Sequence, residues 1–252
     1  MEMMSAMRPL ETFVPPRAAG QRDVLSLALP PMPLVRVAFV GVGARGRMAV
    51  TRWCHIPKVE IAAVCDVSRE VAEEVARHVE QLGKPRPKVY WGETAYKELC
   101  QQQGVNLVYV CTDWMSHVPI AIHAMEQGKS VAVEVPAALT LKDIWKLIDT
   151  AEQTRQHCMM LENAVYDRFE MAVCQMVHEG LLGELVHVEG GYAHPIGDRW
   201  TPWRMKYSRL NAGDVYPTHS IGPICRLLDI HRTDRMHYLT AMQTNAFLGT
   251  EM

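Results

Sequence analysis

The sequence predicts an α/β chain, with a doubly wound parallel sheet followed by the start of an α+β domain that has a mostly antiparallel sheet. Six short apolar segments between residues 35 and 162 alternate with segments of helical periodicity. A glycine-rich turn follows the first of these segments. After residue 163 the pattern changes to the apolar–polar alternation of a strand with one wet face. We therefore predict a flexible leader at 1–34, a first domain at 35–163 and a partial second domain at 164–252.

The composition is that of an ordinary globular protein. The chain has 252 residues, 48% of them hydrophobic and 21% charged, which is enough for one large or two modest domains. Its net charge of -2 and the lack of a basic cluster interleaved with aromatic residues argue against a nucleic-acid partner. No apolar run is long enough to cross a bilayer. The seven cysteines form no C-x-x-C pair, so buried free thiols are favoured over disulfides or a metal site.

The first 34 residues are irregular and rich in proline. The apolar run Val24–Leu29 is too short for the core of a signal peptide, and Asp23 and prolines flank it. We interpret this segment as a flexible leader or a misassigned start. The sequence leaves the compartment open between cytoplasmic and exported, and it leaves a homo-oligomer open as well.

The first predicted strand, Val37–Val40, leads directly into the glycine turn. Gly41, Gly43 and Gly46 match G-x-G-x-x-G between a buried strand and a helix, the fingerprint of a Rossmann dinucleotide site. Asp66 follows the second strand, Val59–Cys65, about 20 residues later, as that fingerprint requires. A carboxylate there accepts both ribose hydroxyls and repels a 2′-phosphate, so NAD is predicted over NADP. Arg69 nearby moderates that preference.

The remaining elements follow from periodicity and capping residues. In the first domain we expect helices at Ser68–Leu82, Ala95–Gln102, Ser116–Gln127 and Thr140–Gln156, and strands at Lys88–Trp91, Asn106–Cys111, Ser130–Glu134 and Cys158–Glu162. In the second we expect a helix at Arg168–Glu179 with Met171, Cys174 and Val177 or His178 inward, a strand at Glu184–Tyr192, an irregular stretch from His194 to Asp214, a helix at Ile221–Leu228 and a strand at Met236–Thr244. A single strand pair is too little for a stable sheet, so we expect the second domain to be cut short, as a fragment or by a premature stop.

Ligands of doubly wound sheets bind beyond the carboxyl ends of the strands. This rule selects Ala44, Arg45, Asp66, Thr112 to His117 (with Trp114), Glu134, Val135, Glu162 and Asn163. Simpler interpretations exist for several of them. Trp114 suits a core aromatic and His117 a capping histidine, whereas Glu134 suits a solvated loop and Asn163 a turn.

The second domain contains a different set of candidates. Tyr192, Trp200, Trp203, Arg204 and Tyr207 are either packing aromatics or the aromatic faces and guanidinium that bind a sugar. His219 follows Pro217 closely, so it is either a helix-capping imidazole or, with Tyr216, a proton-transfer pair.

Together these residues resemble the Gfo/Idh/MocA oxidoreductase superfamily and, more narrowly, glycoside hydrolase family 109, the NAD-dependent alpha-N-acetylgalactosaminidases. The resemblance rests on Gly41–Gly46, Trp114–His117, Glu134-Val135, Leu161–Asn163 with Tyr166, Gly183–His187, Gly190–Tyr192, Trp203-Arg204 and Gly213–His219 running into Gly222-Pro223. The superfamily's ordinary dehydrogenases generally carry Glu-Lys-Pro after the fifth strand, whereas this chain has Glu134-Val135-Pro136. Pro136-Ala137 departs from the Ser-Gly of family members, the loop from Tyr192 to Trp203 is short, and family members continue past this C-terminus.

The resemblance implies which residues bind each ligand. NAD contacts are implied for Ala44, Arg45, Asp66, Trp114 to His117, Glu134, Val135 and Asn163, in addition to the turn glycines. Sugar contacts are implied for Tyr192, Arg204, Tyr216, Pro217, Thr218 and His219, with Tyr216 and His219 as the catalytic acid/base pair.

The implied reaction is an unusual glycoside hydrolysis that does not use two carboxylates. NAD takes hydride from the sugar C3, a base removes the acidified C2 proton, the C1 substituent is eliminated, water adds, and the hydride returns. Two alternatives stay open: a net sugar or cyclitol oxidoreductase of the same superfamily, and an inactive NAD-binding fragment.

Overall fold

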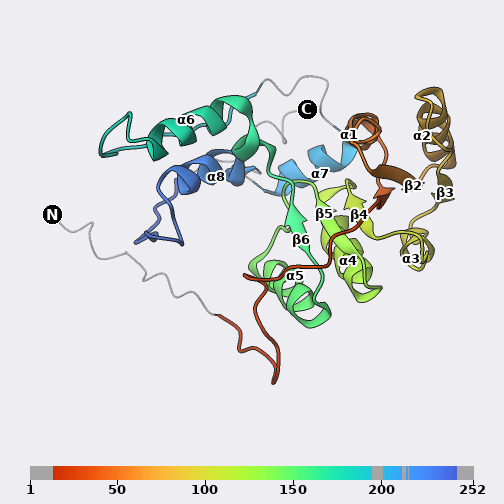
Figure 1. Cartoon of the computed structure of the whole chain (residues 1–252), viewed down its shortest axis with the longest axis horizontal. Coiled ribbons are helices and arrows are strands. Elements are labelled where there is room, and N and C mark those ends of the chain that lie inside the picture. Colours follow the sequence, from red (N-terminus) through yellow and green to blue (C-terminus); the bar gives the residue numbers. More distant parts are fainter. Residues whose placement is uncertain (1–13, 195–200, 212–213, 215, 243–252) are drawn as a thin grey trace. The chain divides into compact units, whose positions relative to one another are not determined.

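The computed structural model describes residues 14–194, 201–211, 214 and 216–242 (Figure 1). Contacts between Cα atoms divide the chain into two compact units. The first comprises Gly20–Asn163 with Ile196–Arg204, and the second comprises Met1–Ala19, Ala164–Pro195 and Met205–Met252.

A six-stranded parallel sheet forms the centre of the first unit, in the order β3-β2-β1-β4-β5-β6. Its strands are β1 (Val35–Val40), β2 (Val59–Asp66), β3 (Lys88–Trp91), β4 (Leu107–Val110), β5 (Ser130–Val133) and β6 (Cys158–Met160). Every neighbouring pair is parallel, so the predicted doubly wound sheet is confirmed. The chain leaves β1 for β2 on one side and returns to β4 on the other, which places the reversal of strand order between β1 and β4.

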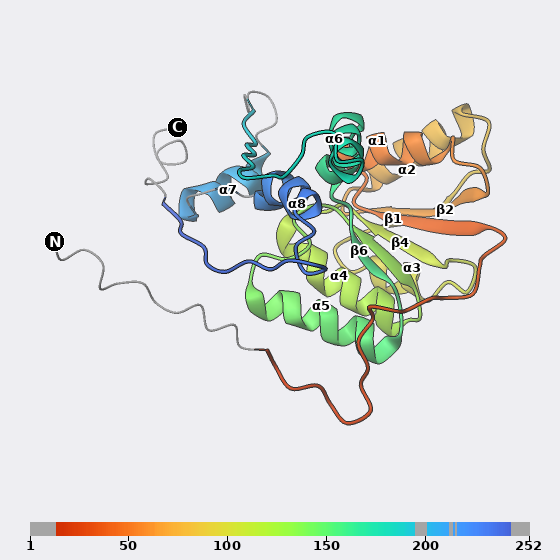
Figure 2. The same ribbon diagram turned by 60° about the vertical axis from the view of Figure 1, so that its left-hand side comes forward.

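Five helices cover the two faces of this sheet. They are α1 (Ala44–Trp53), α2 (Arg69–Gln81), α3 (Tyr96–Cys100), α4 (Trp114–Glu126) and α5 (Leu141–Thr154). Figure 2 shows α1 and α2 on one side of the sheet and α3, α4 and α5 on the other. Ser68 and Thr140 cap α2 and α5, as short polar side chains do at helix starts. Helix α4 begins two residues earlier than predicted because Asp113 accepts hydrogen bonds from the amides of Met115 and Ser116.

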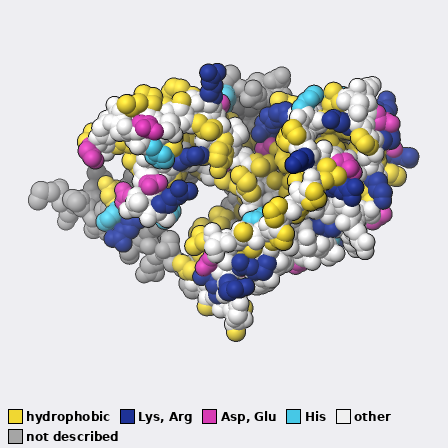
Figure 3. Space-filling view, viewed as in Figure 1, with side chains coloured by type: hydrophobic (Ala, Val, Ile, Leu, Met, Phe, Trp, Pro, Cys, Tyr) yellow, Lys and Arg dark blue, Asp and Glu magenta, His cyan; other side chains and the backbone are white. Residues whose placement is uncertain are grey.

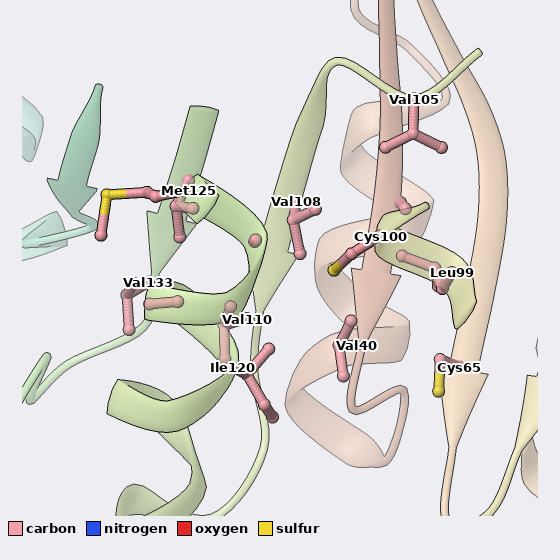
Figure 4. Packing of buried hydrophobic residues seen from close by; sticks show 14 of the residues in the cluster. Val40, Cys65, Leu99, Cys100, Val105, Val108, Val110, Ile120, Met125 and Val133 are labelled. Atoms are coloured by element: carbon pink, nitrogen blue, oxygen red, sulfur yellow. The ribbon is translucent and has the colours of Figure 1, made fainter. Parts of the chain in front are cut away.

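Alternate residues of the strands supply two separate cores. Phe39 and Tyr109 point to the α1/α2 face, whereas Val40 and Val110 point to the face covered by α3, α4 and α5. Figure 4 shows the second core, in which Met125 and Ile120 of α4 and Leu99 of α3 surround the strand residues. Both faces are buried, which explains why these strands are continuous apolar runs in the sequence.

Part of the expected leader packs against α5. Gln21 Nε2 donates to Glu152 Oε2 over 2.8 Å, and Arg155 Nη1 donates to the carbonyl oxygens of Arg22 and Asp23. Val24 packs against the core beneath α5. The segment, drawn in red in Figure 1, therefore makes specific contacts from Gln21 to Val24 before it enters β1.

The surface around α2 carries mixed charges. Arg47 pairs with Glu74 over 2.6 Å, and Arg86 pairs with both Glu73 and Glu80. Figure 3 shows the basic and acidic side chains interspersed there. Among the described residues, no helix is both long and apolar enough to span a membrane.

The described part of the second unit is built from helices and has none of the strands that the sequence predicted. Its main helices are α6 (Arg168–His178) and α8 (Pro217–Leu227), which pack against each other. The short 3-10 helix η1 (Asn163–Tyr166) precedes α6. Cys174 is buried as predicted, but the prediction that Met171 points inward is wrong, because its side chain is 47% exposed.

Two strand predictions in the second unit are wrong. Residues 184–192 and 236–242 are extended or irregular and form no ladder among the described residues, and 243–244 lie outside them. Alternation indicates which side of a segment can be buried, but a strand also needs a hydrogen-bonding partner. The stretch from His194 to Asp214, predicted as irregular, contains helix α7 (Pro202–Leu210). Helix α8 begins four residues before its predicted start, since Pro217 suits the first turn of a helix.

Buried thiols predict a loss of stability at alkaline pH. Burial raises the pKa values of Cys65, Cys100 and Cys111 from 9.0 to about 12. The folded chain therefore keeps protons that the unfolded chain releases, so stability present below pH 9 is expected to fall as pH rises toward 12. Urea unfolding between pH 7 and 11 measures this slope. The Cys65→Ala/Cys100→Ala double variant should show a shallower slope than the parent chain, and an equal slope would contradict the assignment.

Candidate functional site

The glycine turn between β1 and α1 is set by close backbone approach. Gly41 has φ of +84°, and a Cβ atom there would lie 2.6 Å from the carbonyl oxygen of Cys111. A Cβ atom on Gly46 would lie 2.1 Å from the carbonyl oxygen of Gly41. Side chains at these two positions would push α1 away from β1 and β4. Gly41 and Gly46 thus supply the tight turn and the helix–strand packing that the fingerprint requires.

Gly43 differs from the other two because the space beside it is open. Apart from its chain neighbours, no heavy atom of the described residues lies within 4 Å of a Cβ built on Gly43, and the residue is exposed directly before the start of α1. The first turn of α1 contains no acidic residue. Its amide groups lack intrahelical acceptors, as in any helix, and its dipole favours an anion. The residues present therefore fit a dinucleotide pyrophosphate at this end of α1.

Asp66 lies at the carboxyl end of β2, next to the glycine turn. Its Oδ2 atom accepts from the Val42 amide over 2.9 Å, and Oδ1 accepts from the Ser68 amide over 3.1 Å. Both contacts leave further lone pairs on the carboxylate, which is half-buried and suits the ribose hydroxyls. Arg69 stacks over the Trp91 ring, with its guanidinium carbon 4.5 Å from the ring centroid.

Arg45 and Glu134 form a bidentate ion pair. Arg45 Nε donates to Glu134 Oε1 over 2.9 Å, and Arg45 Nη2 donates to Oε2 over 3.1 Å. Tyr109 Oη donates to Oε1 over 2.6 Å. Burial opposes the charge on Arg45, but hydrogen bonding to Glu134 and its negative charge outweigh burial and raise the Arg45 pKa. The sequence selected Arg45 and Glu134 separately, and the fold joins them.

His117 is buried, and each of its ring nitrogens faces a backbone carbonyl oxygen. Its Nδ1 atom lies 2.8 Å from the Pro136 oxygen, and Nε2 lies 3.2 Å from the Thr112 oxygen. Burial lowers its pKa despite these carbonyls, so the ring is neutral and carries one N–H at pH 7. The shorter contact assigns that proton to Nδ1. In this structure His117 joins the loops after β4 and β5, a structural role that the sequence interpretation did not include.

Trp114 begins α4 and lies in an aromatic cluster with Trp203 and Arg204. The two indole rings meet edge to face with centroids 4.8 Å apart. The Arg204 guanidinium lies 4.3 Å from the Trp203 ring centroid and 5.8 Å from that of Trp114. An arginine expected to bind sugar is thus adjacent to a tryptophan expected near the cofactor. Aromatic faces stabilise such a cation while leaving its N–H groups able to donate.

The other candidates of the first unit differ in exposure. Ala44 and Asn163 are exposed at the starts of α1 and η1, whereas Val135 is buried after β5. All follow strands of one parallel sheet, so they lie at the same edge as Asp66 and Glu134.

Tyr192, Tyr216 and His219 form a cluster in the second unit. The Tyr216 and His219 rings stack, with centroids 5.2 Å apart and planes 5° from parallel. The Tyr192 ring lies 4.6 Å from His219 and 5.7 Å from Tyr216, measured between centroids. His194 extends the cluster, 4.7 Å from Tyr192. Residues separated by more than 20 positions are therefore brought together around one imidazole.

The start of α8 sets the positions of Tyr216 and His219. Tyr216 is the N-cap residue and Pro217 occupies the first turn, where its missing amide proton costs no helical hydrogen bond. Asp214 Oδ1 accepts from the Tyr216 amide over 2.7 Å. Pro217 is exposed, and the buried Thr218 hydroxyl has no hydrogen-bond partner among the described residues.

Several residues of these groups were not predicted from the sequence. Tyr109, Trp91 and His194 were not selected. Tyr109 carried a usable signal, because a tyrosine inside a buried strand needs a partner for its hydroxyl. Neither Trp91 nor His194 carried one, since their roles depend on neighbours distant in sequence.

The order of the strands, the glycine turn and Asp66 define an NAD-binding Rossmann domain. The chain belongs to the Gfo/Idh/MocA oxidoreductase family: residues 35–162 match the family described as "Oxidoreductase family, NAD-binding Rossmann fold". Residues 166–250 match "Glycosyl hydrolase 109, C-terminal domain". Both matches confirm the resemblance found in the sequence.

Relatives of this chain carry family 109 names. Glycosyl hydrolase family 109 protein 1 of Phocaeicola vulgatus is 50% identical over 249 residues, covering 97% of this chain and 53% of that protein. An alpha-N-acetylgalactosaminidase of Bacteroides fragilis is 43% identical over 238 residues, covering 90% of this chain and 56% of that protein. The chain thus spans about half the length of these curated relatives.

A solved structure shares the fold. The myo-inositol dehydrogenase of Lactobacillus casei, in complex with NAD(H) and myo-inositol, is 22% identical, with a TM-score of 0.62 over 78% of this chain and 55% of that one. At this identity the likeness supports the fold alone.

Two glycines of the turn, Gly43 and Gly46, predict separable effects of substitution. Gly43→Ala should leave the melting temperature unchanged but weaken NAD binding about tenfold, because a methyl group would enter the open space that the pyrophosphate needs. Gly46→Ala should lower the free energy of unfolding by about 1–3 kcal/mol, because its Cβ would collide with Gly41. Calorimetry measures both quantities. Gly104→Ala, also in open space, is the matched control; equal behaviour of all three variants would refute the assignment.

Asp66 predicts a preference for NAD over NADP. Asp66→Asn keeps an oxygen for the Val42 amide, loses the acceptor for the Ser68 amide, and removes the charge that repels a 2′-phosphate. The ratio of NAD to NADP affinity should fall about tenfold. Competition binding with both dinucleotides measures it, with Glu73→Gln on α2 as a control for a lost surface carboxylate. An unchanged ratio would exclude Asp66 from the ribose site.

Proposed function

We propose that this chain carries the cofactor site and sugar-binding residues of an NAD-dependent glycosidase that hydrolyses terminal alpha-N-acetylgalactosamine. The cluster of Tyr192, Tyr216 and His219 is the observation that carries the proposal. It joins two phenols and an imidazole, which can exchange protons with a sugar, in the segment that matches the family 109 C-terminal domain. The name of the Bacteroides fragilis relative supports the substrate.

The residue after Glu134 supports hydrolysis over net oxidation. A lysine is expected there in ordinary dehydrogenases of the superfamily, where it serves the alcohol proton. This chain has Val135, whose side chain is buried and cannot take part in proton transfer. Tyr216 and His219 supply the acid/base groups in its place.

The chain's residues have distinct proposed roles. Bound NAD supplies a reversible hydride acceptor for the sugar C3. Gly41, Gly43, Ala44 and Gly46 would hold its pyrophosphate and Asp66 its adenosine ribose. Arg45, Trp114, His117, Glu134, Val135 and Asn163 would flank its nicotinamide half. Tyr216 Oη and the His219 imidazole exchange protons with the C3 hydroxyl and C2. Arg204 donates to the N-acetyl group or a neighbouring hydroxyl, Tyr192 stacks on or donates to the sugar, and Pro217 and Thr218 line the same site.

The proposal also assigns the two ligands to two domains of the chain. A cofactor domain at 35–163 followed by a substrate domain at 164–252 is supported by the two family matches at 35–162 and 166–250, although Ile196–Arg204 belong to the first compact unit.

Isotope exchange tests the reaction class. With NAD and 4-nitrophenyl alpha-N-acetylgalactosaminide in deuterated water, the released sugar should carry deuterium at C2, as mass spectrometry and NMR measure. Tyr216→Phe and His219→Ala should each lower the rate of nitrophenol release about 100-fold or more, because each removes a proton-transfer group. Tyr238→Phe, an exposed tyrosine of the same unit, is the control.

Three results would contradict the proposed glycosidase function. Product without deuterium at C2 would exclude elimination. Reduced nicotinamide absorbance in proportion to free sugar, without cleavage, would favour the net oxidoreductase. Cleavage by the Phocaeicola vulgatus relative but not by this chain would favour the inactive NAD-binding fragment.

A further inference from the structure

Tyr109, the penultimate residue of β4, is held rigidly by neighbouring rings. Its side chain is buried, and its ring stacks on Phe39 with centroids 4.7 Å apart and planes 24° from parallel. The ring of Trp53, at the end of α1, meets it edge to face at 5.6 Å. Phe39 also meets Trp53 edge to face, so three rings from β1, β4 and α1 lock one another. Tyr109 therefore has little freedom to move its hydroxyl.

The sheet register brings this hydroxyl to Glu134. Tyr109 pairs with Phe39 on β1 and with Ala132 on β5. Glu134 follows Ala132 by two residues, so its side chain lies on the same face of the sheet as Tyr109. Tyr109 Oη reaches Glu134 Oε1 over 2.6 Å, a short distance typical of a hydroxyl bonded to a carboxylate.

Glu134 in turn holds Arg45 in the first turn of α1. The Glu134 side chain is 10% exposed, whereas the Arg45 side chain is 40% exposed. A half-exposed arginine would otherwise sample many rotamers, and the bidentate pair selects one of them. The carboxylate can form that pair only in one orientation, and the Tyr109 hydroxyl fixes this orientation from the buried side. Burial, followed by the charge of Glu134, raises the pKa of Tyr109 above its usual value, so the hydroxyl remains a donor at any physiological pH.

The strand order indicates which half of the dinucleotide lies beside the hydrogen-bonded network of Tyr109, Glu134 and Arg45. Asp66 ends β2, on one side of β1, whereas Tyr109 and Glu134 belong to β4 and the end of β5, on the other side. With the pyrophosphate at α1 and the adenosine ribose at Asp66, the nicotinamide half extends over β4 and β5.

We infer that Tyr109 is a positioning residue of the cofactor site, which orients Glu134 and, through it, Arg45 for the nicotinamide half of the dinucleotide. The inference rests on the proposed NAD site and adds a residue, in the interior of a strand, that acts on the ligand through another side chain. Its effect is therefore specific to one half of the cofactor.

The test compares the whole cofactor with its adenosine half. Tyr109→Phe keeps the stacked ring and removes only the hydroxyl. Calorimetric titration of the full chain should show NAD affinity about tenfold weaker, as expected for a lost hydrogen bond to a charged group. The affinity for AMP, measured by competition against NAD, should stay within about twofold of the parent chain. Tyr96→Phe on α3, outside this network, is the matched control and should change neither affinity.

A double-mutant cycle distinguishes positioning from general stability. In the Glu134→Ala background, adding Tyr109→Phe should cause no further loss of NAD affinity, because the group that Tyr109 orients is gone. A full tenfold loss in that background would overturn the inference, as would equal weakening of NAD and AMP or unchanged NAD binding in Tyr109→Phe. If the parent chain itself fails to bind NAD, the proposed cofactor site is refuted rather than the role of Tyr109 alone.

Discussion

The close approach of α1 to β1 is the constraint on which the candidate cofactor site depends. Gly46 can lie beside the Gly41 carbonyl only because Gly46 has no side chain, and Gly41 can lie beside the Cys111 carbonyl for the same reason. This contact brings the first turn of α1 to the carboxyl edge of the sheet, with Gly43 open to solvent at its start. The same approach places Arg45 within reach of Glu134. Without it, the helix dipole and the arginine would both lie too far from the strand ends to act on one ligand.

Hydrogen bonds from the turn and from neighbouring strands then order this edge. Asp66 accepts from the Val42 amide and so connects the end of β2 to the glycine turn. Glu134 connects β5 to α1 through Arg45 and to β4 through Tyr109. Polar groups at the edge are therefore fixed by one another before a ligand binds. Such preorganisation reduces the entropy lost when a flexible dinucleotide is held.

In the second unit, the sequence predicted the residues of the candidate site better than it predicted the secondary structure. The sequence predicted strands at Glu184–Tyr192 and Met236–Thr244, but the described parts of both lack partners. Yet Tyr192, Tyr216 and His219, selected for their chemistry, form one cluster. Residue type and the Tyr-Pro-Thr-His spacing determine what these groups can do. Strand formation depends on hydrogen bonds to another segment, and no local pattern reveals that segment.

The sequence by itself determined the doubly wound parallel sheet, the glycine turn and Asp66, because these follow from local periodicity and from the backbone freedom of glycine. It also identified the family through motifs that are contiguous in the chain. Only the tertiary structure decided that Arg45 binds Glu134, that Tyr109 orients this pair, and that His117 joins two loops. Each of these interactions joins residues on different elements, and the register of parallel strands, which sets them side by side, is fixed by packing across the whole sheet.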